Sequence, residues 1–130
     1  MHPRFFRSVA AVLVALAAAA CGGIANPSSN QTQTFSSIVT PGGAPGKHEF
    51  TASKSGEITV TVTNMNPPFN GFLSVAWLGA GCSGLIQENI YAQVGKSAIA
   101  GPIQKGSYCV EVFDAGFIVP EAYTLTVSHP

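Results

Sequence analysis

Residues 56–63 read GEITVTVT, and this stretch decides the fold. Ile58, Val60 and Val62 alternate with threonines, so one face of an extended segment is apolar and the other is polar. A period of two residues is typical of a β-strand that buries one face, and β-branched residues favour strands on both faces. We therefore predict a strand over residues 58–63.

The same alternation recurs near the end of the chain. Tyr108, Val110 and Val112 share one face of a second predicted strand, and the segment YTLTV at residues 123–127 alternates in the same way. Weaker strand candidates are residues 35–39, 48–52, 72–78, 90–94 and 97–100. Turn-forming residues cluster at 41–46, 53–56, 64–71, 79–84 and 105–106. About seven to eight short strands with such turns predict an all-β fold: a single antiparallel β-sandwich with jelly-roll or Greek-key connections over residues 35–130.

Residues 1–20 have the pattern of an export signal. Arg4 and Arg7 precede an uninterrupted apolar run from Val9 to Ala20. A helix of that length rises only about 18 Å, whereas the hydrocarbon core of a bilayer is roughly 30 Å thick. The segment is therefore too short to remain as a transmembrane anchor, and we predict a signal helix that is cleaved.

The end of this signal resembles a bacterial lipobox, in which small residues precede a cysteine that becomes lipidated. The residues in question are AAAC at 18–21, although a lipobox usually carries Leu where this chain has Ala18. Ordinary cleavage after Ala20 is the alternative, and it would release a secreted chain with a free amino-terminal thiol. The resemblance implies a lipid on Cys21 and a membrane anchor in the bacterial cell envelope, facing the periplasm or the exterior. Residues 21–34, which carry no charge, are then predicted to form a flexible tether.

The chain has three cysteines, Cys21, Cys82 and Cys109, and an odd number in an exported protein needs an explanation. If Cys21 carries lipid, Cys82 and Cys109 remain as a pair in an oxidising compartment, where disulfides persist. A bridge between them would close a loop of about 28 residues and contribute roughly 3 to 4 kcal/mol in the chain-entropy model. The rival interpretation, a redox or metal pair, lacks the CxxC spacing that such sites use.

Charge is sparse and excludes one class of partner. After removal of residues 1–20, four lysines and no arginine remain beside six acidic residues, so the net charge is 4 − 6 = −2. Nucleic-acid and anionic-membrane binders need clustered Lys or Arg, because these side chains displace counterions from phosphates. We therefore predict no nucleic-acid partner, and contact with the membrane through the lipid alone.

Several segments together resemble the bacterial pre-peptidase C-terminal domain family and its small-lipoprotein relatives. They are Phe50 before the turn glycine Gly56, ITVTV at 58–62, GSYCVEV at 106–112 and YTLTV at 123–127. The match covers about residues 47–130 and implies a β-sandwich that accompanies secreted proteases as an accessory or binding module. This chain departs from the family pattern, since it contains no protease domain and lacks the acidic clusters that some members use for calcium.

Other motifs carry little chemistry. Residues 79–84 match G-x-G-x-x-G, but a dinucleotide site needs a helix and a parallel βαβ unit, so we predict a wide turn that presents Cys82 and no cofactor. The histidines of the mature chain, His48 and His129, are expected to be solvated or to lie at the rim of the domain. Asp114 could join one of these histidines and a serine in a hydrolase, but no G-x-S-x-G motif is present. Asp114 could also join Glu121 in a calcium loop, but calcium needs more oxygen ligands than these two carboxylates offer.

Large apolar residues in predicted loops suggest a contact surface. Phe69, Phe117 and Ile118 lie in or near turn segments where solvent exposure is expected, and exposed apolar patches mark interaction sites. The alternative is that these side chains fold back over the end of the sandwich. Trp77 continues the alternation of Leu73 and Val75, so it is expected in the core and not on a sugar-binding surface.

These patterns favour a non-catalytic cell-envelope lipoprotein that displays a β-sandwich on a lipid anchor, for interaction or for structure. A module that binds carbohydrate or peptidoglycan, or that assists a protease, is the first alternative. A hydrolase is the second, and it would require His48, Asp114 and a serine or glutamate to meet in space.

Overall fold

The computed structural model describes residues 29–130, which form two antiparallel sheets of four strands each. The predicted signal peptide, Cys21 and the tether up to residue 28 lie outside the described residues. The strands are β1 (Gln31–Val39), β2 (Gly46–Ala52), β3 (Gly56–Asn66), β4 (Leu73–Leu78), β5 (Leu85–Ala92), β6 (Ser97–Ile103), β7 (Gly106–Phe113) and β8 (Glu121–His129). The predicted all-β sandwich is confirmed.

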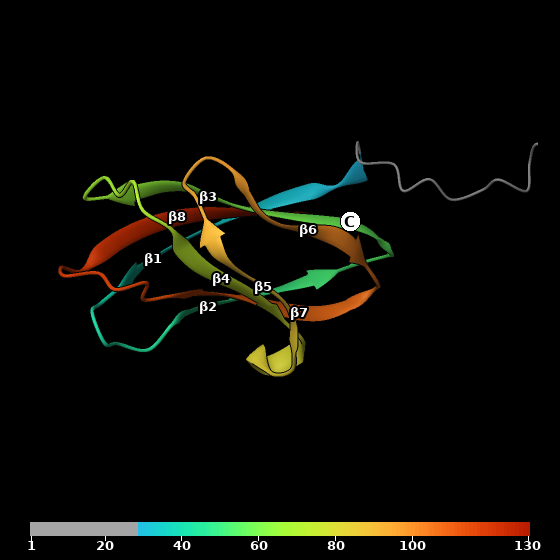
Figure 1. Cartoon of the computed structure of the whole chain (residues 1–130). Helices are drawn as coiled ribbons and strands as arrows, with labels where there is room; N and C mark the ends of the chain where they lie inside the picture. Colours follow the sequence, from blue (N-terminus) through green and yellow to red (C-terminus); the bar gives the residue numbers. More distant parts are fainter. Residues whose placement is uncertain (1–28) are drawn as a thin grey trace, which may run out of the picture.

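The strand order identifies the connections as those of a jelly roll. One sheet has the order β1-β8-β3-β6 and the other β2-β7-β4-β5, and the two sheets form the two layers seen in Figure 1. β1 pairs with β8, β2 with β7, β3 with β6 and β4 with β5, all antiparallel. The four strands of the first half therefore pair in turn with the four strands of the second half, as in one long hairpin. Folding this hairpin over on itself gives the two sheets.

The core lies between the sheets and follows the alternation in the sequence. Ile58, Val60 and Val62 of β3 face Val75 and other apolar side chains of the opposite sheet, and all are buried. Tyr123, Leu125 and Val127 of β8, Val110 and Val112 of β7, and Trp77 of β4 complete the same cluster. Trp77 is 4% exposed, so its predicted place in the core is confirmed.

The strands run between two distinct ends of the sandwich. What we call the loop end holds the connections at residues 40–45, 67–72, 93–96 and 114–120. The terminal end holds the start of β1, the end of β8 and the turns at 53–55 and 104–105. In Figure 1 the start of β1 lies opposite the loops that follow β1, β3 and β7.

Several strands are longer than predicted, and the differences are largest at β1 and β5. β1 begins at Gln31, so residues 31–34 belong to the sheet and not to the tether that was predicted to extend to residue 34. These residues are polar and show no alternation, but they pair with Thr126 to His129 of β8. β5 begins at Leu85, well before the predicted residue 90, because bulges in its pairing with β4 disturb the alternation.

The disulfide bonds the turn between β4 and β5 to strand β7. Cys82 and Cys109 are bonded, with a Cα–Cα distance of 5.0 Å, so the predicted pairing is present. Cys82 ends the short 3-10 helix η2 (Ala80–Cys82), where Gly81 has a φ of 66° and Cys82 a φ of 55°. These left-handed conformations are the ones that glycine favours, and they make the wide turn that was predicted to present Cys82.

Candidate functional site

Asp114 organises the loop end of the sandwich. One of its carboxylate oxygens accepts a hydrogen bond from the Gly42 amide at 2.8 Å, and the other accepts bonds from the amides of Gly116 at 2.9 Å and Phe117 at 2.8 Å. The bonds from Gly42 and Phe117 lower the pKa of Asp114 below its ordinary value. The carboxylate therefore joins the β1–β2 loop to the β7–β8 loop.

The predicted contact surface divides into buried and exposed members. Phe117 is 6% exposed and meets the half-buried Phe69 edge to face, with ring centroids 4.9 Å apart. The two rings therefore follow the alternative, in which they fold back over the end of the sandwich and pack on each other. Ile118 is 92% exposed and stands at the tip of the β7–β8 loop beside the exposed Val119.

His48 lies between the sheets and not in solvent. It is buried, its Nε2 atom forms a hydrogen bond of 2.6 Å with the Tyr123 hydroxyl, and Phe35 packs on its ring. Burial lowers the pKa of His48, and burial raises the pKa of Tyr123 to about 12 against a smaller opposing effect of Ser37. A Cβ atom at Gly46 would overlap the Tyr123 hydroxyl, so the glycine makes room for this pair.

The second histidine is buried as well. His129 has no exposed surface, its Nδ1 atom lies 3.2 Å from the carbonyl oxygen of Pro130, and its ring contacts Phe50. The expectation of solvated or rim histidines is therefore wrong at both positions, because each histidine lies on the buried face of its strand. His48 and Asp114 bond to different partners, and among the described residues no hydrogen bond links either to the other or to a serine.

One group of metal-ligand residue types is present in the part of the chain that the structure describes. It consists of Cys82, Cys109 and Glu111, but both sulfurs are consumed by the disulfide. Glu111 instead pairs with Lys47, whose Nζ atom lies 3.6 Å from its carboxylate. A disulfide has no thiolate to offer a metal, so this group is structural.

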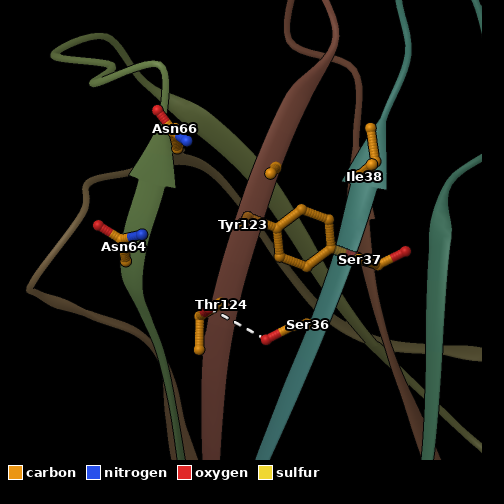
Figure 2. A pocket seen from close by; sticks show the side chains of 8 residues that line it. Ser36, Ser37, Ile38, Asn64, Asn66, Tyr123 and Thr124 are labelled. Carbon is orange, nitrogen blue, oxygen red and sulfur yellow. Dashed lines mark hydrogen bonds between the residues drawn. The ribbon is translucent and has the colours of Figure 1, made fainter.

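A groove opens on the outer surface of the sheet that contains β1, β8 and β3. Its volume is 390 Å³, and its lining includes Ser36, Ile38, Asn64, Asn66 and Thr124. Figure 2 shows Ser36 of β1 and Thr124 of β8 joined by a hydrogen bond, with Asn64 of β3 across the groove. We call this feature the β1/β8/β3 groove. The sequence contained no signal for it, because its residues come from three strands that only the register brings together.

Comparisons with known proteins leave the chain without an assigned family. No protein-family model matches it, and no curated protein matches it. A solved chain from a study of Bacillus endospore appendages, described as a novel family of disulfide-linked pili, is similar in structure. The TM-score is 0.37 at 12% sequence identity, and the match covers 84% of this chain and 94% of that chain. The sandwich is therefore defined by the strand order and register of this chain itself.

The described features define a disulfide-bonded antiparallel β-sandwich. Within residues 29–130 no helix has the length and apolar character needed to span a bilayer. Disulfides persist in oxidising compartments, so the domain fits an extracellular or cell-envelope protein.

Proposed function

We propose that this protein is a non-catalytic cell-envelope lipoprotein that presents a β-sandwich on a lipid anchor at Cys21. The observation that carries the proposal is the disulfide between Cys82 and Cys109. The sequence contains three cysteines, so this bond leaves Cys21 as the one cysteine without a disulfide partner within the chain. Lipidation of Cys21, directly after the small residues Ala18 to Ala20, would account for this odd cysteine.

The strand ends support an orientation for the anchored domain. Ten residue steps separate Cys21 from Gln31, where β1 starts at the terminal end, and a fully extended chain of that length spans at most about 35 Å. The terminal end would therefore face the membrane, and the loop end with Ile118 would face away from it. In this orientation the exposed Ile118 and Val119 offer a contact to an envelope partner.

The surroundings of the ionisable residues favour a non-catalytic role. His48 and His129 are buried between the sheets, and Asp114 is occupied by three backbone amides. A general acid or base must reach a substrate, and these groups already serve the packing of the sandwich and the joining of its loops. The function therefore depends on surface contacts.

The intact mass of the protein, purified after expression with its own leader in a bacterial host, tests the proposal. We expect a diacyl or triacyl modification on Cys21, and a mass gain of two thiol hydrogens when Cys82 and Cys109 are reduced. Two or more acyl chains give durable attachment, whereas a single chain binds reversibly. An unmodified chain that begins at Cys21 with a free amino group would refute the anchor.

A further inference from the structure

The β1/β8/β3 groove carries no charge, and this sets it apart from the opposite surface of the sandwich. All of its lining residues are hydroxyl, amide or apolar residues. The outer surface of the other sheet holds the ion pair of Lys47 with Glu111 and the exposed acids Glu49 and Glu88. A groove without charged side chains has no ion-pair partner for an anion or a cation, so its lining favours a neutral ligand.

A bulge turns extra polar side chains toward the groove. The pairing of β3 with β8 shifts between Val62 and Asn64, so Thr63 is inserted and both Thr63 and Asn64 are exposed. The Thr63 hydroxyl donates a hydrogen bond of 3.2 Å to the Thr124 carbonyl, which replaces part of the interrupted ladder. Bulges commonly re-aim side chains at functional sites, and this one presents Asn64 beside Asn66.

The side chains of the groove suit a ligand rich in hydroxyl groups. The side-chain amides of Asn64 and Asn66 make no hydrogen bond with any other described residue, and each side-chain amide can both donate and accept. Ser36 and Thr124 lie opposite them and are hydrogen bonded at 3.1 Å, with Ile38 as the apolar edge (Figure 2). A protein partner would need a broader apolar centre than Ile38 alone supplies.

The polar surface continues beyond the groove along the strands. The register places Thr34 beside Thr126, and Thr126 beside Thr61, in one row across the sheet. The next row contains Thr32, Ser128 and Thr59. From Ala122 to Ser128 this track is about 20 Å long, which is enough for a chain molecule and longer than a single sugar requires.

We propose that the β1/β8/β3 groove, together with these threonine rows, binds a neutral polysaccharide chain. The volume of 390 Å³ lies within the range of small-ligand sites. The groove is open, and sugar hydroxyls exchange bonds with water for bonds with the protein, so each contact contributes little net affinity. Binding is expected with a Kd on the order of 1 mM and depends on several contacts along the track. This inference does not depend on the lipid at Cys21.

Affinity electrophoresis of the full mature protein, in neutral detergent, tests the proposal. The probes are three soluble neutral polysaccharides, laminarin, mannan and hydroxyethyl cellulose, with alginate as the acidic counterpart. We expect at least one neutral polymer to retard the protein and alginate to leave its mobility unchanged. Hydrogen exchange with the retarding polymer should show protection in β1, in β8 and around Asn64.

Two matched double variants locate the binding surface. Ser36→Ala with Thr124→Ala removes an exposed hydroxyl pair in the groove, whereas Thr51→Ala with Ser107→Ala removes an equivalent pair, hydrogen bonded at 3.4 Å, from the other sheet. The first should weaken retardation about tenfold and the second should leave it unchanged. Thermal melts check that both variants are folded.

Three results would overturn the proposal: no retardation by any neutral polymer, equal retardation by alginate, or equal losses in the two double variants. None of them would alter the mass expected at Cys21, so failure here is separate from failure of the anchor.

Discussion

At the scale of single residues, polar groups inside this domain hold the two sheets and their loops in register. His48 of β2 bonds to Tyr123 of β8 and so links one sheet to the other. Asp114 links two loops through backbone amides of Gly42, Gly116 and Phe117. His48 and Tyr123 are 75 positions apart in the sequence, and Asp114 and Gly42 are 72 positions apart, so both links join distant parts of the chain.

The burial of His48 makes stability depend on pH. Its pKa is lowered from 6.5 by burial, so the unfolded chain takes up a proton more readily than the folded one. The free energy of unfolding should therefore fall as the pH falls through 6.5. Melting temperatures measured between about pH 7.5 and 5.5 should decrease, and His48→Gln should flatten the decrease. An unchanged slope in His48→Gln would show that another group is responsible.

Phe117 and Ile118 are neighbours with opposite roles. Phe117 is 6% exposed and packs on Phe69, so Phe117→Ala should lower the free energy of unfolding by about 3 kcal/mol. Ile118 is 92% exposed, so Ile118→Ala should change it by less than about 0.5 kcal/mol. Urea unfolding of the two variants measures both effects. Equal destabilisation would contradict the packing of the loop end.

At the scale of elements, a side-chain hydrogen bond joins two edge strands, β5 and β6. β5 exposes Leu85 and Tyr91, which lie 61% and 67% exposed at an edge that could pair with another chain. Asn89 of β5 donates a hydrogen bond of 2.9 Å to the Ala98 carbonyl of β6 and accepts one of 2.8 Å from the Tyr91 amide. These bonds occupy backbone groups of both edge strands and limit pairing with a second molecule.

The disulfide should stabilise the domain through the unfolded chain. Its bridge spans a sequence separation of 27, and the chain-entropy model assigns such a loop about 3 to 4 kcal/mol. Reduction should therefore shift the urea midpoint downward, and the double variant Cys82→Ala/Cys109→Ala should show the lower midpoint with or without reductant. If reduction left the midpoint unchanged, the bridge would contribute nothing to stability.

At the scale of the whole molecule, the jelly roll joins the first strand to the last. β1 pairs with β8 along its whole length. Gln31 lies opposite His129 at one end, and Val39 lies opposite Glu121 at the other. Closing so long a loop costs conformational entropy, which the pairing of β1 with β8 must offset. The start of β1 therefore matters more to the fold than its polar sequence suggests.

Shortening β1 tests this dependence. A chain that starts at Phe35 loses the pairing of residues 31–34 with β8, whereas a chain that starts at Ser29 keeps it. Several ladder hydrogen bonds are lost, so the shorter chain should be less stable by about 1 to 3 kcal/mol. Thermal or urea unfolding of the two chains, both oxidised, provides the comparison. Equal stability would indicate that residues 31–34 are dispensable, as a tether would be.

Much of this architecture follows from local pattern. The alternation around Val60, Val110 and Leu125 predicted the central strands, because a period of two residues marks one buried face wherever a strand lies. The number and spacing of cysteines predicted the Cys82–Cys109 bond. Local pattern failed at the edges, where β1 and β5 carry no clean alternation and are strands because a neighbour supplies the ladder.

The sequence by itself determined the β-sandwich, the buried faces of its central strands and the disulfide. Only the tertiary structure decided that His48, His129 and Phe117 are buried, and that Ser36, Thr124 and Asn64 share one groove. The physical reason is that periodicity states which side of a strand a residue occupies, whereas burial and grouping depend on the strands that lie beside it. In a jelly roll those strands come from opposite ends of the chain, beyond the reach of any local pattern.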